Sequence, residues 1–311
     1  MLPNTNIDEI KKADPKKIAG LKLFMGSSTG DMLVEEKEKL EKIFAESPLL
    51  IATHNEDGKI IAANAEKYKE QFNGEVPIKY HPIIRSEEAC YKSTSLAIDL
   101  AKKHKTRLHV LHVSTAKELA LFNQQLPVNE KLITAETCFQ YLWFDADSYE
   151  TLGTRIKCNP AIKSKENKEQ LIKAANNNLI DTVATDHAPH LLSEKEGDAL
   201  TATSGIPSVQ HSLVGMLELV KKGLISKEKL VEKMCHNPAT IFKINKRGFI
   251  RKGYYADLVI IDPNKSWKVE KNNIYSKCGW SPFEGITFSS AVTHTFVNGK
   301  LIYENGKFDE S

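Results

Sequence analysis

The stretch TVATDHAPH, residues Thr182–His190, has the pattern of an apolar strand that ends abruptly in one acid and two imidazoles. Such groups are costly at the end of a buried strand unless they have partners or a chemical purpose. The stretch therefore predicts a strand whose exit belongs to a site. It also raises the question of what the other strands carry at their ends.

Strand-like and helix-like runs alternate on both sides of this stretch. The runs that predict strands are 19–25, 49–53, 106–113, 131–136, 154–158 and 180–185. Helices are predicted from Ser86 to His104 and at about 115–123, 165–175, 207–221 and 226–235. Strands that alternate with helices predict parallel βαβ units, and therefore an α/β fold.

The pattern changes after about Asn245. Short strands are predicted within 249–261, 289–297 and 300–303, and the dipeptides Asn298-Gly299 and Asn305-Gly306 predict turns. We therefore predict an α/β body over residues 1–245 and a small β unit over residues 246–311.

Composition excludes several classes of protein. Of the 311 residues, 43 are Lys or Arg and 40 are Asp or Glu, and the two signs are mixed, so no basic face for nucleic acid is predicted. The five cysteines are odd in number and lack a C-x-x-C spacing, which favours a reduced, cytoplasmic protein. No apolar run reaches the roughly 18 residues of a membrane helix, and the N-terminus has no signal-peptide core.

Four predicted strands carry, or end at, a residue able to bind a metal: Lys22, His54, His112 and Asp186. In a parallel barrel the carboxyl ends of the strands open on one face, where active sites of that architecture collect. Imidazole and carboxylate ligands together suit Zn²⁺. A bound metal lowers the pKa of water, and a neighbouring carboxylate can move the released proton to a leaving group.

Simpler interpretations stay open for the individual residues. A single His at a strand end is more often a hydrogen-bonded structural residue, and His109 is predicted to be structural because it faces the other side of its strand. Asp186 alone could equally cap a helix or pair with His187 or His190.

Lys22 is the least usual of the four. It lies in LKLF on the face opposite Leu21 and Leu23, so it is predicted to point into the interior of a barrel. A buried ammonium is costly unless it is paired or neutral. Carboxylation of the amine by CO₂ is one solution, because the product is an anion whose two oxygens can bridge two metal ions.

Six motifs together resemble dihydroorotases of the amidohydrolase superfamily. The motifs are GLKLFM at 20–25, THNEDG at 53–58, LHVLHVSTAKEL at 108–119, KCNPAI at 157–162, ATDHAPH at 184–190 and CGWSPFEG at 278–285. The resemblance spans the chain, and DHAPH with SPFEG favours dihydroorotase over hydantoinases and allantoinases. It implies a (β/α)8 TIM-like metal-dependent hydrolase barrel with a small C-terminal β unit.

The resemblance also implies a role for each motif residue. Lys22 is expected to be carboxylated and to bridge two zinc ions, with His54 and His112 as ligands of the second ion. Asp186 is expected to bind the first ion and to act as general acid and base. Substrate contacts are implied for the polar or backbone groups of Asn4, Asn159, His190, Ser204 and Gly205.

The chain departs from the family pattern at its start. The family's His-x-His-x-Arg motif, expected shortly before the LPNT segment, is absent, and no His-x-His occurs in the sequence. We therefore expect a barrel that lacks its first strand and roughly the first 50–70 residues. The retained ligands allow one zinc ion but are too few for the other, so low activity is expected. A barrel without one strand exposes two edges and part of its core, so weak stability is expected as well. A milder departure is Phe139, where relatives often have Pro.

The implied reaction is the reversible interconversion of N-carbamoyl-L-aspartate and L-dihydroorotate in pyrimidine (UMP) biosynthesis, by a cytoplasmic enzyme that forms homodimers. Two alternatives stay open. One is an inactive homologue that serves as a structural partner of another enzyme, which the missing His-x-His favours. The other is a related cyclic amidase acting on hydantoin or allantoin, which DHAPH and SPFEG disfavour.

Overall fold

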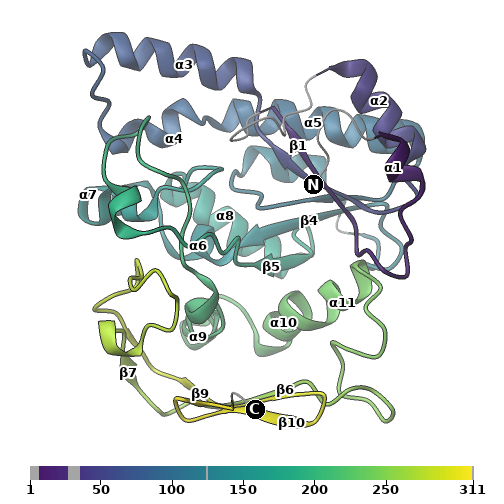
Figure 1. The fold of residues 1–311 in the computed structure, drawn as a ribbon, viewed down its shortest axis with the longest axis vertical. Helices are drawn as coiled ribbons and strands as arrows, with labels where there is room; N and C mark the ends of the chain where they lie inside the picture. The colour runs from purple at the N-terminus through teal and green to yellow at the C-terminus, as the bar shows by residue number, and fades with distance from the viewer. Residues whose placement is uncertain (1–6, 27–35, 124, 310–311) are drawn as a thin grey trace.

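The computed structural model describes residues 7–26, 36–123 and 125–309 (Figure 1). Asn4, one of the predicted substrate contacts, lies outside these residues. Within them, no helix is both long enough and apolar enough to cross a membrane.

A five-stranded parallel sheet forms the centre of the α/β body. Its strands are adjacent in chain order and pair in register, for example Lys22 with Ala52 and Phe24 with His54. An isolated parallel bridge between His187 and Ile206 continues the pattern beyond the last strand. The strands are β1 (Leu21–Met25), β2 (Ile51–Asn55), β3 (Leu108–Val110), β4 (Ile133–Cys138) and β5 (Thr182–Ala184).

Helices cover the sheet, and the longest of them, α5 (Glu87–His104), shows how the sequence sets its ends. The Ser86 hydroxyl accepts from the Ala89 amide at 3.3 Å, and Lys105 adopts a left-handed conformation that stops the helix. The other helices are α1 (Ile7–Lys11), α2 (Lys37–Glu46), α3 (Gly58–Gln71), α4 (His81–Ile84), α6 (Phe139–Trp143), α7 (Tyr149–Leu152), α8 (Lys165–Asn176), α9 (Val209–Lys221), α10 (Lys227–Val231) and α11 (Asn237–Ile241).

Two predicted elements differ from the structure. Residues 154–158 do not form a strand: Gly153–Ile156 is a 3₁₀ helix, although Ile156 and Cys158 are buried. A short apolar run indicates burial but does not by itself distinguish a strand from other buried segments. The helix predicted at 115–123 is a single 3₁₀ helix, Lys117–Leu121.

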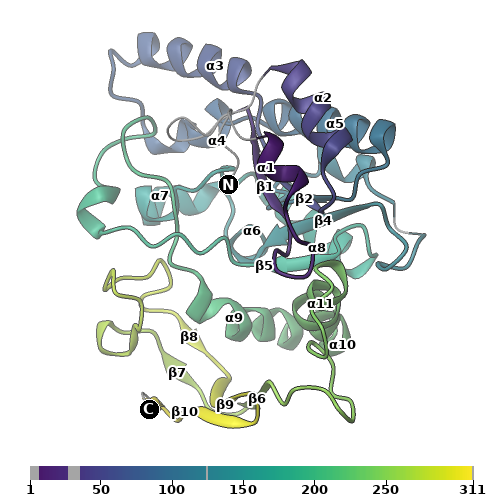
Figure 2. The same cartoon turned by 45° about the vertical axis from the view of Figure 1, so that its right-hand side comes forward.

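The C-terminal strands form a separate antiparallel sheet. It lies at the far end of the molecule from β1–β5, with α9, α10 and α11 between the two sheets (Figures 1 and 2). Asn298 and Gly299 both have positive φ, which confirms the predicted hairpin turn. The strands are β6 (Leu258–Asp262), β9 (Ala291–Val297), β10 (Lys300–Glu304) and β11 (Lys307–Phe308), and β7 (Trp267–Lys268) pairs with β8 (Thr287–Phe288). The domain division at residue 245 stays a prediction.

Strand β6 is unusually exposed for its composition. Leu258, Val259 and Ile260 are 36%, 47% and 48% exposed, although they are consecutive apolar residues of one strand. Among the described strands, β6 pairs only with β9. Both faces and one edge of this apolar strand therefore meet solvent in the described part of the chain.

Phe139 has a fully buried ring. The ring contacts α9 so closely that a Cβ on Gly215 would lie 2.0 Å from its Cζ atom. It also stacks on Phe283, with ring centroids 5.5 Å apart. Gly215 is therefore needed for α6 and α9 to pack at this distance.

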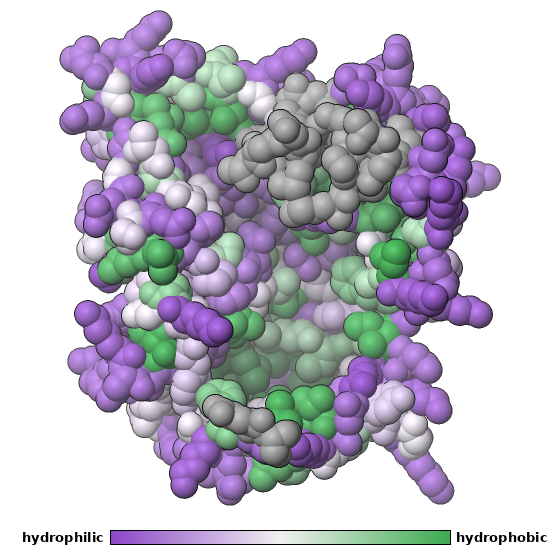
Figure 3. All heavy atoms as spheres, in the orientation of Figure 1, coloured by the Kyte–Doolittle hydropathy of each residue, from purple (hydrophilic) through white to green (hydrophobic). Residues whose placement is uncertain are grey.

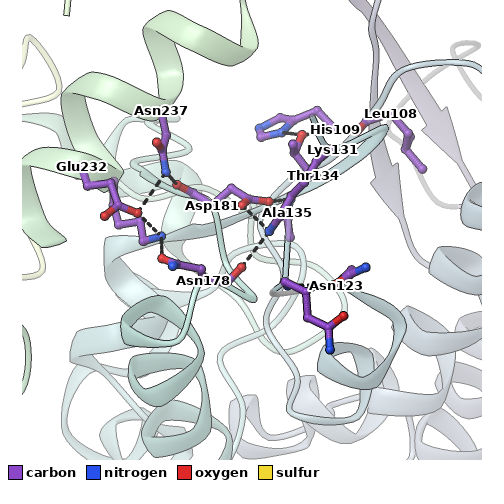
Figure 4. Close-up of polar contacts among 12 residues, drawn as sticks. Leu108, His109, Asn123, Lys131, Thr134, Ala135, Asn178, Asp181, Glu232 and Asn237 are labelled. Carbon is purple, nitrogen blue, oxygen red and sulfur yellow. Dashed lines mark hydrogen bonds and ion pairs between the residues drawn. The ribbon is translucent and has the colours of Figure 1, made fainter. Parts of the chain in front are cut away.

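A buried polar network lies at the amino ends of β4 and β5 (Figure 4). Lys131 Nζ donates to Asp181 Oδ1 at 2.7 Å and to the Asn178 carbonyl at 2.7 Å. The second oxygen of Asp181 accepts from the Ala135 amide at 2.9 Å, and the Asn237 side chain donates to the Asp181 carbonyl at 2.8 Å. The network ties two strands to α11 at the end of the sheet opposite the strand exits.

We expect Asp181→Asn to lower the free energy of unfolding by about 3–5 kcal/mol, because it leaves the Lys131 charge buried without its counter-ion. Both side chains are only 3% exposed. Urea denaturation followed by circular dichroism measures the change. As a control, Lys12→Gln removes the exposed ion pair with Glu9 and should not shift the transition. Equal transitions for both variants would contradict the role of the network.

Candidate active site

One cavity of about 570 Å³ collects every predicted site residue that the structure describes. The face of the molecule shown in the space-filling view is hollowed across its middle (Figure 3). The cavity is lined by Lys22, His54, His112, Asn159, Asp186, His190, Ser204 and Gly205, together with further residues described below. Residues spread over more than 180 positions of sequence thus meet in one place.

The parallel strands bring the four candidate ligands together. Lys22 lies in β1 and His54 lies in β2, close to its carboxyl end. His112 follows β3 by two residues, and Asp186 follows β5 by two residues. Because all these strands run the same way, their exits open on one face of the sheet.

Two of these residues adopt a backbone conformation that is rare for residues with a side chain. His112 has φ of 42° and Asp186 has φ of 44°, both in the left-handed region. Non-glycine residues held in this region cost about 1–3 kcal/mol each and cluster at functional sites. The surrounding structure thus holds both side chains at the strand exits against a local preference.

A chain of polar contacts connects the two imidazoles to buried charges. His54 Nδ1 lies 3.0 Å from His112 Nε2, and His54 Nε2 lies 3.0 Å from Glu56 Oε2. The same carboxylate oxygen of Glu56 accepts from Arg85. Burial alone would raise the pKa of Glu56, but Arg85 and His54 outweigh burial and lower the pKa to about 2.

Lys22 and Asp186 influence each other across the cavity. Burial lowers the pKa of the Lys22 amine, and the carboxylates of Asp186 and Glu136 partly oppose this shift. Burial raises the pKa of the Asp186 carboxyl, and Lys22 and His54 partly oppose that shift. Lys22 Nζ also lies over the ring of Phe24, 4.8 Å from its centroid. The cavity therefore disfavours the charged form of both groups, although their charges attract.

The described geometry offers a metal two facing imidazole nitrogens, His54 Nδ1 and His112 Nε2. Among the described residues, no three His, Cys, Asp or Glu side chains converge into a group that could hold a metal ion. Asp186 therefore does not close a site with the two imidazoles. Lys22, which is not one of these residue types, lies in the same cavity.

A further part of the cavity wall is built from residues 157–159 and 203–205. Ser204 Oγ donates to Asn159 Oδ1 at 3.1 Å. Gly205 has φ of 148°, and a Cβ there would lie 2.6 Å from the Ala188 carbonyl oxygen, so only glycine fits. Lys195 Nζ donates to three backbone carbonyls, of Lys157, Thr203 and Gly205, and so ties the two segments together.

Sequence reasoning missed several cavity residues. Arg85, Lys157 and His81 line the cavity, and Glu56 lies directly behind His54. Burial lowers the pKa of Lys157 to about 8, and neighbouring Lys195 and Arg85 add to the shift. Two of these four residues lie in motifs that the sequence analysis identified, Glu56 in THNEDG and Lys157 in KCNPAI. Their charge gave no indication that they are buried.

His109 is structural in the described geometry, in keeping with its prediction. Its Nδ1 lies 2.8 Å from Thr134 Oγ1, and its ring packs against Phe242. His187 is also occupied elsewhere, since its Nδ1 accepts from the Ser208 amide at 3.1 Å. Neither imidazole is among the residues that line the cavity.

The comparisons with known proteins agree with the fold. Residues 37–302 match the amidohydrolase family, and the chain therefore belongs to that family. It is 31% identical to a dihydroorotase of Pyrococcus furiosus over 283 residues, which are 91% of this chain and 61% of the relative. It is also 31% identical to a dihydroorotase of Methanosphaera stadtmanae, over 93% of this chain and 66% of the relative.

Solved structures show the same architecture. An L-hydantoinase (dihydropyrimidinase) from Arthrobacter aurescens has a TM-score of 0.90 and 30% identity, and the match covers 98% of this chain and 69% of that chain. A dihydropyrimidinase from Brevibacillus agri has a TM-score of 0.87 and 25% identity, with coverage of 99% and 69%. These matches confirm the predicted fold class, the TIM-like barrel of the amidohydrolases. The chain spans about three fifths of the length of the first curated relatives it matches.

The buried imidazole of His81 predicts a measurable dependence of stability on pH. Its Nε2 lies 3.0 Å from the Cys158 carbonyl oxygen, and burial, with Arg85 and Lys157 nearby, lowers its pKa from 6.5 to about 3. The unfolded chain therefore binds a proton below pH 6.5 that the folded chain excludes. Stability from this residue is fully present above pH 6.5 and is lost as the pH falls toward 3.

We expect wild-type protein to lose up to about 2 kcal/mol of unfolding free energy through His81 between pH 7 and pH 5. His81→Gln, which keeps a donor for the Cys158 carbonyl, should lack this part of the loss. Urea titrations of both proteins at the two pH values measure the difference. Equal losses in the two proteins would show that His81 is not held neutral in the folded state.

Proposed function

We propose that this chain carries the active site of a cyclic amide hydrolase of the dihydroorotase type. The observation that supports it is the single cavity in which Lys22, His54, His112 and Asp186 meet the wall formed by Asn159 and Ser204. The relatives named dihydroorotase, at 31% identity, support the same reading. The proposed substrates are L-dihydroorotate and N-carbamoyl-L-aspartate, interconverted reversibly in pyrimidine synthesis.

The charge of the cavity favours an anionic substrate. Two cationic residues, Arg85 and Lys157, line it beside the proposed metal ligands, whereas Asp186 is the sole acidic residue among its described lining. Dihydroorotate and carbamoyl-aspartate both carry carboxylates, whereas the hydantoin ring carries none. An excess of positive groups in a partly enclosed cavity attracts anions and raises their local concentration.

A divalent metal, zinc by family resemblance, fits the residues at one position. His54 and His112 would hold it through the two facing nitrogens, and a carboxylated Lys22 would supply a further oxygen ligand. When bound, such a metal polarises the amide carbonyl and acidifies water.

Intact-protein mass spectrometry under native conditions tests the carboxylation, which adds one CO₂ to wild-type protein and none to a Lys22→Met variant.

The remaining chemistry belongs to the residues of the chain. Hydrolysis forms a bond from a water oxygen to the ring carbonyl carbon and breaks the carbon–nitrogen bond. Asp186 accepts the proton released by the water and returns it to the departing nitrogen, so charge and protons balance. Asn159, Ser204 and the Gly205 backbone hold the ring, and the cationic wall holds the carboxylate.

A second candidate is hydrolysis of a neutral cyclic amide such as hydantoin, which the solved L-hydantoinase structure favours. The discriminating experiment measures zinc content and turnover of dihydroorotate, hydantoin and dihydrouracil by the purified chain. Preference for dihydroorotate supports the proposal, and preference for an uncharged ring supports the alternative. A folded, zinc-loaded chain that turns over none of them would support the third reading, an inactive structural homologue.

We expect Asp186→Asn to lower the kcat for dihydroorotate by at least about 100-fold, because the variant cannot carry the proton between water and nitrogen. Asp145→Asn is the matched control, since Asp145 pairs with Lys168 outside the cavity and its loss should leave kcat unchanged. Steady-state assays at matched zinc content check the expectation. A kcat near wild type for Asp186→Asn would remove Asp186 from the reaction.

A further inference from the structure

Glu56 lies in a buried contact chain that the sequence motifs left without a role. Its side chain is fully buried, and one of its oxygens, Oε2, accepts from Arg85 and lies 3.0 Å from His54 Nε2. The Arg85 side chain is 15% exposed and that of His54 is 6% exposed. The buried Glu56 carboxylate therefore connects Arg85 to His54, and both of these side chains line the cavity.

The contacts fix where protons lie in this contact chain. A carboxylate paired with a guanidinium is ionised and only accepts hydrogen bonds. His54 must therefore donate its Nε2–H to Glu56. When the His54 ring is neutral it carries one ring proton, and Nδ1 then keeps its lone pair. That nitrogen is the one that faces His112 Nε2 at 3.0 Å.

We propose that Glu56 is a positioning residue that holds His54 in the Nε2-protonated tautomer, with Arg85 as its anchor, so that Nδ1 faces the cavity as a lone pair. The tautomer follows from this chain's own contacts. The consequence for metal affinity rests on the proposed function. Carboxylates that orient a ligating histidine through its second nitrogen commonly change metal affinity by about 10–100-fold when they are removed.

The imidazole of His112 is held differently from that of His54, without a carboxylate partner among the described residues. His112 Nδ1 is buried, and no hydrogen-bond partner for it is found in the described part of the chain. Its ring is placed instead by the left-handed backbone at φ 42°. Of the two facing imidazoles, only His54 has its tautomer set by an ionised partner.

Glu118 shows that burial of a carboxylate does not by itself give this arrangement. It is also buried, but its oxygens accept from the hydroxyls of Thr94 and Thr115 at 2.7 and 2.8 Å, away from the cavity. Replacing Glu118 therefore removes a buried carboxylate of the same kind without touching His54. It provides the matched control.

The experiment uses the full chain as wild type, Glu56→Met, Glu56→Gln and Glu118→Met. Long-range proton–nitrogen NMR spectra of metal-free protein report which nitrogen of His54 carries the proton, and calorimetric titration with zinc reports affinity. If Glu56→Met does not fold, the double variant Glu56→Met/Arg85→Met is used in its place. The double variant removes the acceptor and its charged partner together.

We expect wild type and Glu118→Met to show His54 protonated on Nε2. Glu56→Met should lose this preference and bind zinc about 10–100-fold more weakly. Glu56→Gln keeps an acceptor oxygen and should restore the tautomer. The inference is overturned if wild-type His54 is protonated on Nδ1, or if Glu56→Met keeps both the tautomer and the zinc affinity. If wild-type protein binds no zinc, the metal part of the proposed function is refuted. The tautomer of His54 in the metal-free protein still tests the role of Glu56.

Discussion

The shared direction of five parallel strands is the constraint on which the rest of this structure depends. Parallel pairing places β1, β2, β3 and β5 so that Lys22, His54, His112 and Asp186 reach one side of the sheet. No local preference would bring these groups together, because they are separated by 32, 58 and 74 positions in sequence. The register of strand pairing, which the apolar residues of the strands set, therefore determines which side chains meet in the cavity.

The two ends of the sheet use buried charge for different purposes. At the amino ends, Lys131 and Asp181 form an ion pair and hydrogen bonds to the neighbouring backbone, so their charges stabilise the packing of the strands. At the carboxyl ends, Glu56 is satisfied through one oxygen only, and its other oxygen is buried with no hydrogen-bond partner in the described residues. A fully satisfied buried network holds its members rigidly, whereas a buried polar atom without a partner is costly.

The sequence was sufficient for the fold class, the hairpin at Asn298 and eight of the residues that line the cavity, because each depends on periodicity, turn chemistry or a motif. It was insufficient where tertiary packing decides. In place of the strand predicted at 154–158, Gly153–Ile156 is a 3₁₀ helix, and the buried Lys157 and Cys158 that follow it line the cavity. Arg85 and Glu56 carry no local mark of burial, since their pairing across 29 positions exists only in the folded chain.

Strand β6 has a consequence for contacts between molecules. Leu258, Val259 and Ile260 present apolar side chains on both faces of a strand that, among the described strands, has a neighbour on one edge only. Backbone groups on a free edge act as a template for the strand of another molecule, and natural proteins usually blunt such edges with charge or proline. The chain 258–262 has Asp262 alone as a charge, at its end. This edge therefore lacks the features that natural sheets use against pairing with a second molecule.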